Sequence, residues 1–254
     1  MTVLIGYAFI FGAIIGSFLN VCIYRLPARM SLMTPPSTCP CCNTRIAWYY
    51  NLPVVGYLVL RGRCAQCRQP ISFRYPAVEI LTGLLFAWAM CRFGIHLMTP
   101  VFCVFIAALV TITFIDLDCQ IIPDVISLPG IILGFAGSFV VPWVSWQDSV
   151  MGILFGYGVI SIIAWSYEQI TGREGMGMGD AKLLAMVGAL LGLKAVFMSL
   201  FFGSILCSVI GLPLALRKGG QFALPFGPFL ALGALIALFF GQQIMNWYLP
   251  QLGL

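Results

Sequence analysis

Charged residues are scarce in this chain: they make up 8% of its 254 residues, whereas 61% of the residues are hydrophobic. Soluble globular domains carry roughly 25% charged residues, so this composition excludes an ordinary soluble domain. Apolar runs long enough to cross a bilayer recur along the chain. The composition therefore indicates a protein that crosses a membrane several times and has the lipid bilayer as a partner.

The chain is also nearly without histidine, and its apolar runs do not alternate apolar with polar residues. The chain has one histidine, His96, so a serine or cysteine nucleophile activated by histidine has a single possible base. The apolar runs are continuous, whereas the strands of membrane barrels alternate apolar and polar residues. Because backbone polar groups inside a bilayer must be satisfied within the protein, the continuous runs predict transmembrane helices.

Eight apolar runs are expected to be membrane helices. They lie near residues 3–24, 77–92, 97–115, 125–144, 148–166, 181–193, 195–216 and 226–248. The sixth and seventh runs are divided only by Gly192, Leu193 and Lys194, which leaves seven spans as the alternative to eight. The predicted fold class is all-α polytopic, with about eight transmembrane helices and one long loop, residues 25–76, between the first two.

The basic residues predict the orientation of the chain. Seven of the thirteen lie in the first loop: Arg25, Arg29, Arg45, Arg61, Arg63, Arg68 and Arg74. If the chain has eight spans, four more basic residues fall on the same face as the first loop: Arg173, Lys182, Arg217 and Lys218. The other two, Arg92 and Lys194, fall on the opposite face. Cytoplasmic loops carry the excess of Lys and Arg, so the first loop is predicted to be cytoplasmic and both termini to lie outside. Topology accounts for the net charge of +5, which requires no nucleic-acid partner.

The eight carboxylates gather at the predicted cytoplasmic helix ends, with Asp148 as the exception. Asp116 and Asp118 end the third span two positions apart, so on a helix they point about 200° apart and cannot share one face. Three of the carboxylates could have a purely structural role. Asp116 could be an interfacial charge, and Asp124 could cap the next helix. Glu79, expected in the first turn of the second span, could be stabilised by the helix dipole. Ionisable groups at membrane depth are nevertheless candidates for function.

A glycine-rich segment, GMGMGD, precedes the sixth span and ends in Asp180. Asp180 could simply cap that helix. Gly175, Gly177 and Gly179, however, permit backbone conformations closed to other residues and the close approach of another chain. We therefore interpret Gly177 and Gly179 as part of a cleft that holds an extended peptide by edge pairing.

Asp116 and Asp180 are 64 residues apart, enough for one helix out and one helix back, so both return to the same membrane face. Two carboxylates brought close together cannot both ionise readily and share a proton near neutral pH. One can then activate a water molecule as a general base while the other protonates a leaving amine. This aspartic-protease chemistry needs neither a metal nor a histidine, and His96 is predicted to lie on the opposite face.

Four of the ten cysteines form two CxxC pairs in the first loop: Cys39, Cys42, Cys64 and Cys67. Two such pairs, with 21 residues between them, predict a tetrahedral zinc site. A cytoplasmic location disfavours structural disulfides, in agreement with metal-bound thiolates. Cys41 could replace Cys42 as a ligand, and four reduced thiols without a metal are the alternative to the site as a whole.

Five sequence segments together resemble the bacterial type IV prepilin peptidase family: GSFLNVCIYRLP, the paired CxxC loop, RYPAVE, FIDLDCQIIPD and GMGMGDAKLL. The glycine–aspartate element is similar to that of the wider GxGD intramembrane aspartyl proteases. The resemblance implies an enzyme of the bacterial inner membrane that cuts the short basic leader from prepilins or secretion pseudopilins on the cytoplasmic side, after a glycine. It also implies N-methylation of the new amino terminus with S-adenosylmethionine as the methyl donor.

The resemblance also implies roles for individual residues. Asp116 matches the first catalytic aspartate of the family and Asp180 matches the second, whereas Asp118 and Asp124 do not match the catalytic pair. The CPCC segment keeps the family's CPxC pattern, which supports a structural zinc ion held by the four paired cysteines. The implied domains are a first helix at 1–24, a zinc-binding region associated with methyl transfer at 25–76, and a transmembrane peptidase domain at 77–254, with both termini periplasmic.

Three other functions remain open on the sequence. A proton-coupled transporter could use Asp116 and Asp180 as a relay, although such proteins place their sites near the bilayer midplane between repeated halves. A membrane-anchored zinc module would leave the one-sided carboxylates unexplained. A peptidase that does not methylate its product is the third, because no glycine-rich fold for binding S-adenosylmethionine is visible.

Overall fold

The computed structural model describes residues 1–34, 36–172, 177–211, 213 and 224–248. The regular structure within them is helical, and strand-like pairing is limited to two isolated bridges, Thr38 with Arg45 and Arg63 with Pro70. The chain divides into two compact units, Met1–Thr111 and Ile112–Leu254. The boundary falls inside one continuous helix, α4, which runs from Met98 to Cys119.

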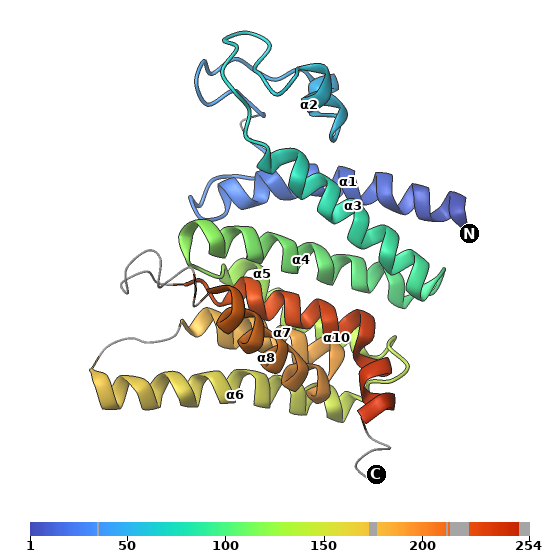
Figure 1. Cartoon of the computed structure of the whole chain (residues 1–254), viewed down its shortest axis with the longest axis vertical. Coiled ribbons are helices and arrows are strands. Elements are labelled where there is room, and N and C mark those ends of the chain that lie inside the picture. The colour runs from blue at the N-terminus through green and yellow to red at the C-terminus, as the bar shows by residue number, and fades with distance from the viewer. Residues whose placement is uncertain (35, 173–176, 212, 214–223, 249–254) are drawn as a thin grey trace. The chain divides into compact units, whose positions relative to one another are not determined.

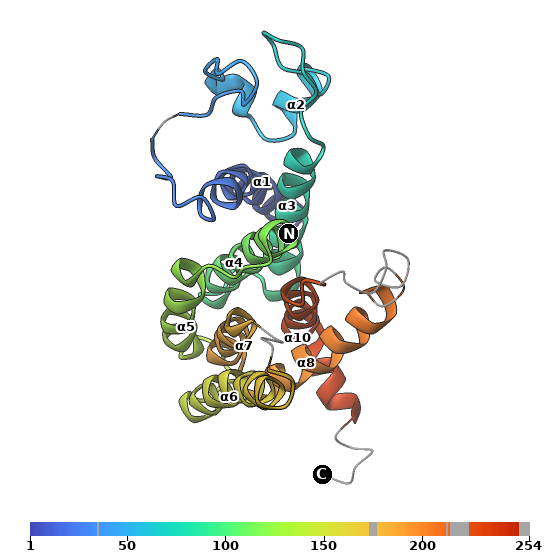
Figure 2. The ribbon, with the colours of Figure 1, turned by 90° about the vertical axis from the view of Figure 1, so that its left-hand side faces the viewer.

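The first unit contains two long helices that lie side by side, with the cysteine loop between them in the chain (Figures 1 and 2). Helix α1 spans Thr2–Arg25 and α3 spans Arg74–Phe93, and the loop carries a short 3-10 turn, η1 at Trp48–Asn51, and helix α2 at Val55–Val59. Glycine allows the close approach of α1 to α3: a Cβ atom on Gly16 would lie 2.8 Å from the Cα atom of Glu79.

The second unit is a bundle built around α7. Its elements are α5 (Asp124–Ser138), α6 (Trp146–Thr171), α7 (Met178–Leu191), α8 (Leu193–Leu206), the π-helical turn η2 (Cys207–Gly211) and α10 (Gly227–Tyr248). Helix α7 packs against α5, α6, α8 and α10, and Figure 2 shows it among them. Nearly every α7 residue from Asp180 to Leu191 is buried, as expected for a helix that is apolar on all sides.

Within the described residues, six helices are long and apolar enough to cross a membrane: Thr2–Arg25, Arg74–Phe93, Met98–Cys119, Trp146–Ile170, Leu193–Gly211 and Gly227–Trp247. The predicted all-α polytopic membrane fold is therefore confirmed. Helices α5 and α7 have only 15 and 14 residues. At 1.5 Å per residue each is about 21–23 Å long, shorter than a hydrocarbon core of about 30 Å. The total of eight transmembrane helices therefore stays a prediction.

Two helix boundaries can be compared with the expected spans, and the structure differs from the expectation at the first and agrees with it at the second. The fourth run was expected to continue to residue 144, but α5 ends at Ser138. Pro142 accounts for the early end, because proline disfavours a helical conformation in the residue before it and has no N–H to donate. The expected break after the sixth run lies at Gly192, which has a φ of +80°. There the carboxylate of Asp148 accepts a hydrogen bond from the Leu193 N–H at 3.2 Å, which satisfies the start of α8.

Candidate active site and metal centre

Asp116 lies in the last turn of α4, within the second unit, and is 5% exposed. Its Oδ2 atom accepts a hydrogen bond of 3.0 Å from the N–H of Gly227, the first residue of α10. Asp118, two positions further along α4, is exposed. The two side chains therefore lie in different environments, as the helical spacing predicts.

Asp180 is the third residue of α7 and is 9% exposed. The residue that caps this helix is Gly177, and the Asp180 N–H donates a hydrogen bond of 3.1 Å to the Gly177 carbonyl. The explanation of Asp180 as a helix cap is wrong, because it lies inside the first turn. Its carboxylate is buried in the first turn of α7 and makes no capping hydrogen bond there.

Ile122 shows that the two aspartates come together. A Cβ atom on Gly179, next to Asp180, would lie 2.9 Å from the Cβ of Ile122. A Cβ atom on Gly227 would lie 3.3 Å from the Cδ1 of Ile122 and 2.7 Å from Oδ2 of Asp116. The end of α4 and the starts of α7 and α10 thus converge on one residue, and the charge of Asp116 acts on the carboxyl group of Asp180.

The third carboxylate of this region, Asp124, has a different role. It is the first residue of α5, whose N-cap is Pro123, so the expectation that Asp124 caps this helix is wrong. Its Oδ1 atom forms an ion pair of 2.6 Å with the Nζ atom of Lys182, on the first turns of α7. Both side chains keep contact with solvent, so the pair joins the starts of α5 and α7 at the surface.

The glycines before Asp180 differ in their surroundings. Gly177 is exposed, and a Cβ atom there would meet, among the described residues, only the Gly179 nitrogen, at 3.8 Å. Gly179 is half-buried against Ile122 and has no room for a side chain. Gly175 lies outside the described residues. Packing against the described residues therefore requires a glycine at position 179 but not at position 177.

The four paired cysteines form one cluster in the first unit: Cys39, Cys42, Cys64 and Cys67, whose Sγ atoms all lie within 4.8 Å of one another. The Sγ atoms of Cys39 and Cys67 are 3.8 Å apart. A tetrahedral zinc ion with Zn–S bonds of about 2.3 Å requires sulfur atoms about 3.8 Å apart. The cluster therefore fits zinc. Cys41 is exposed and outside it, so the alternative ligand set with Cys41 in place of Cys42 is wrong.

Each CxxC pair folds as the same small knuckle. In the first, the Cys39 N–H donates to the Thr44 carbonyl, and Asn43 has a φ of +53°. In the second, the Cys64 N–H donates to the Gln69 carbonyl, and Arg68 has a φ of +59°. The residue after the second cysteine thus turns the chain in both knuckles, and each turn directs two sulfur atoms to the cluster.

Local hydrogen bonds favour the thiolate form that a metal needs. Hydrogen bonds from the side chain and the backbone of Thr44 lower the pKa of Cys42 to about 6. Backbone N–H groups of Cys67 and Gln66 lower the pKa of Cys64. The loop therefore prepares these two cysteines as ligands through its own backbone.

Glu79 is placed differently from the sequence expectation. Helix α3 begins at Arg74, so Glu79 lies in its second turn and dipole stabilisation in the first turn does not explain it. Its side chain is 8% exposed, and its Oε2 atom accepts a hydrogen bond of 2.7 Å from the Val54 N–H. Val54 has a φ of +62°, an unusual conformation for a β-branched residue. Glu79 therefore fastens a strained point of the cysteine loop to α3.

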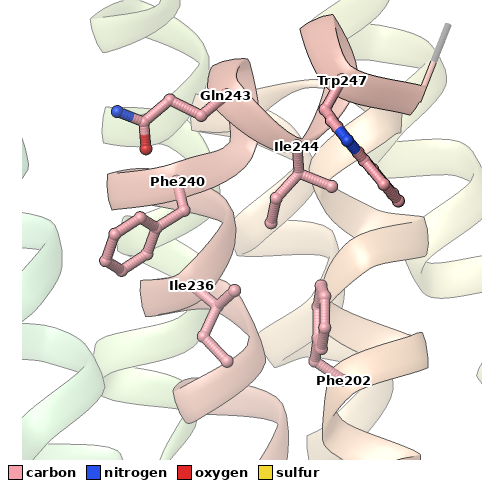
Figure 3. Close-up of a pocket in the computed structure, with 6 residues that line it drawn as sticks. All are labelled: Phe202, Ile236, Phe240, Gln243, Ile244 and Trp247. Atoms are coloured by element: carbon pink, nitrogen blue, oxygen red, sulfur yellow. The ribbon is translucent and has the colours of Figure 1, made fainter.

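Two cavities are lined by residues other than the aspartates. One, of about 400 Å³, is lined by Phe202 of α8 and by residues of α10 from Ile236 to Trp247 (Figure 3). Its lining is apolar apart from Gln243, as suits a membrane-facing groove. The other, of about 410 Å³, lies in the cysteine loop and is lined by residues 36–37, 45–48 and Asn51. Sequence reasoning missed this second cavity, whose one aromatic lining residue is Trp48.

Comparison with known proteins gives two family matches and a group of similar relatives. Residues 10–93 match the Bacterial Peptidase A24 N-terminal domain, and residues 103–212 match the Type IV leader peptidase family.

The relatives include three proteins named Prepilin leader peptidase/N-methyltransferase. The protein of Aeromonas hydrophila is 38% identical, over 95% of this chain and 92% of its own length. That of Pseudomonas putida is 37% identical, over 98% and 95%, and that of Neisseria gonorrhoeae is 36% identical, over 95% and 93%. No solved structure matches the chain. The matches give no support to a transporter.

Proposed function

Because this chain belongs to the type IV leader peptidase family, we propose that it removes the leader of a prepilin or pseudopilin and then N-methylates the new amino terminus. The observation that carries the first activity is the convergence of Asp116 and Asp180. The two side chains come from different helices, are both buried, and lie close enough for their charges to interact.

Each aspartate has a defined part in the proposed cleavage. The ionised carboxylate takes a proton from a water molecule, whose oxygen attacks the carbonyl carbon of the scissile peptide bond. The protonated carboxyl group then gives its proton to the amide nitrogen, and the carbon–nitrogen bond breaks. The Gly227 N–H supports this step by holding the Asp116 carboxylate in one orientation. The site regains one proton as it gives one away, so it is ready for another cycle.

The surroundings of the dyad suit the proposed substrate. A prepilin combines a basic leader with an apolar helix, so its scissile bond would lie at the membrane edge. Asp116 and Asp180 lie at one end of α4 and at the start of α7. The open position beside Gly177 would accept the extended segment around the cut, with a small residue before the scissile bond. From the excess of basic residues we assign this edge to the cytoplasmic face of the bacterial inner membrane, with both termini periplasmic.

The proposed methyl transfer belongs to the cysteine loop of the first unit. When bound, zinc would cross-link Cys39, Cys42, Cys64 and Cys67 and so fix the two knuckles against each other. S-adenosylmethionine, when bound, supplies a methyl group that is activated by its positive sulfur. Cleavage must come first because it creates the amino group that accepts the methyl group. That amine would lose a proton before it attacks the methyl carbon, and S-adenosylhomocysteine would leave.

A single reaction tests both activities. The purified full-length protein, in detergent, is incubated with a prepilin and S-adenosylmethionine, and the product is weighed by mass spectrometry. We expect loss of the leader and then the addition of one methyl group to the new terminus. An uncut prepilin, with enzyme that is folded and holds zinc, would contradict the proposal. A cut but unmethylated product would contradict only its second half.

A further inference from the structure

The cavity in the cysteine loop is built by the first zinc knuckle. Its two chain segments, residues 36–37 and 45–48, lie on either side of the turn that carries Cys39 and Cys42. The Ile46 N–H donates a hydrogen bond of 2.9 Å to the Ser37 carbonyl, and Thr38 pairs with Arg45. The knuckle thus holds the two segments side by side, so a metal that fixes the knuckle also fixes this part of the cavity.

The remaining wall of the cavity is anchored to α3. It is formed by the turn η1, from Trp48 to Asn51. Three residues beyond η1, the Val54 N–H is held by the buried carboxylate of Glu79. Gly56 contacts the Tyr50 carbonyl so closely that a side chain would not fit there. The wall is therefore fastened on both sides by contacts that do not involve the cavity itself.

The side chains around the cavity offer three kinds of contact. Trp48 is 77% exposed, and its ring meets Tyr49 edge-on, with centroids 5.8 Å apart, so the indole is supported but uncovered. Arg45 provides a planar cation suited to a carboxylate, and Asn51 provides an amide that both donates and accepts hydrogen bonds. An aromatic face, a cation and an amide around about 410 Å³ suit a ligand that combines a flat heterocycle with a carboxylate.

We propose that this cavity is the binding site for S-adenosylmethionine, with Trp48 stacked on the adenine, Arg45 paired with the carboxylate of the methionyl part and Asn51 hydrogen-bonded to the adenine edge. This assignment rests on the proposed N-methyltransferase activity and adds the residues that recognise the methyl donor. The assignment also predicts that methyl transfer depends on zinc, because the knuckle of Cys39 and Cys42 forms the frame of the cavity.

The test measures binding with S-adenosylhomocysteine, which has the same adenine and carboxylate but no methyl group to transfer. Isothermal titration calorimetry is carried out on the full-length protein and on Trp48→Ala and Arg45→Gln. Matched controls are Leu58→Ala, an exposed apolar residue of the same loop, and Arg29→Gln, an exposed arginine of the same loop. We expect each cavity variant to bind at least tenfold more weakly, with unchanged zinc content and leader cleavage, while the controls bind like the wild type.

Tryptophan fluorescence gives an independent readout. The chain has six tryptophans, and we expect S-adenosylhomocysteine to change the emission of the wild type but not that of Trp48→Phe. Equal affinity in the wild type, Trp48→Ala and Arg45→Gln, together with normal methylation, would overturn the cavity assignment and leave the proposed function intact. A wild-type protein that cleaves but neither binds S-adenosylhomocysteine nor methylates its product would overturn both.

Discussion

The two units of this chain hold reactive groups in opposite ways. In the first, Cys39, Cys42, Cys64 and Cys67 lie in a loop with little regular structure and are gathered by short turns. In the second, Asp116 and Asp180 lie on helices and are buried. A metal can complete the first site, whereas only helix packing assembles the second. Damage to the metal site should therefore be local, and damage to the helix contacts should affect catalysis directly.

The largest expected effect comes from the dyad. Asp116→Asn and Asp180→Asn should each lower the rate of leader removal by about 10²–10⁴-fold, because each removes one partner in proton transfer. The matched control is Asp118→Asn, which removes an exposed carboxylate from the same turn of α4 and should cleave like the wild type. Cleavage rates are measured by gel shift of a prepilin, and equal losses in all three variants would contradict the assignment.

The next effect concerns the metal. Cys64→Ser should lose most of the bound zinc and lower the methylation rate at least tenfold, because one missing ligand opens a tetrahedral site. Leader cleavage should stay within a few-fold of the wild type. Cys41→Ser, which changes an exposed thiol outside the cluster, should change neither zinc content nor methylation. Metal analysis and mass spectrometry of the product provide the readouts, and a normal zinc content in Cys64→Ser would argue against the cluster as a zinc site.

A smaller effect is expected at Gly179. Alanine there would place a Cβ atom 2.9 Å from the Cβ of Ile122, which also lies against Gly227, the residue bonded to Asp116. Overpacking of this kind costs about 1–3 kcal/mol, so the cleavage rate of Gly179→Ala should fall about tenfold as the dyad is displaced. Gly158→Ala is the control, because at this position of α6 no atom of the described residues lies within 4 Å of the added methyl group. An unaffected Gly179→Ala would show that Ile122 does not position the dyad.

The smallest effect is expected at the ion pair of Asp124 and Lys182. Its side chains are 56% and 23% exposed, and exposed pairs contribute about 0.2–1 kcal/mol. Asp124→Asn should therefore lower the unfolding temperature slightly and leave most of the cleavage activity. Thermal unfolding followed by tryptophan fluorescence measures the first change. A loss of cleavage comparable to that of Asp180→Asn would assign Asp124 to the catalytic machinery.

The two units also differ in how much of them the sequence predicts. The cysteine cluster follows from spacing, because a CxxC pair fixes two sulfur atoms through local turns. The separation of Asp116 from Asp118 follows from the helical period. Two other features do not follow from the apolar runs alone. Helix α5 ends early because of Pro142. Glu79 lies in the second turn of α3 because that helix begins at Arg74, before the apolar run.

Contacts between distant segments were beyond prediction. The role of Ile122 between Gly179 and Gly227 depends on how three helix ends meet, and no local pattern specifies it. The cavity beside Trp48 requires residues 36–37 to lie against residues 45–48, which only the folded knuckle achieves. The sequence identifies the two aspartates but not the residues of the cavity, and in both places tertiary packing supplies the surrounding surfaces.

The central claim is that the dyad cleaves and the cysteine loop methylates, and one mass-spectrometric experiment tests it most directly. Asp180→Asn and Cys64→Ser are each given either an intact prepilin or the already cleaved pilin, with S-adenosylmethionine present. We predict that Asp180→Asn leaves the intact prepilin uncut yet methylates the cleaved pilin. Cys64→Ser should cut the prepilin and methylate neither substrate. The account would be contradicted if Asp180→Asn still removed the leader, or if Cys64→Ser lost cleavage and methylation to the same extent.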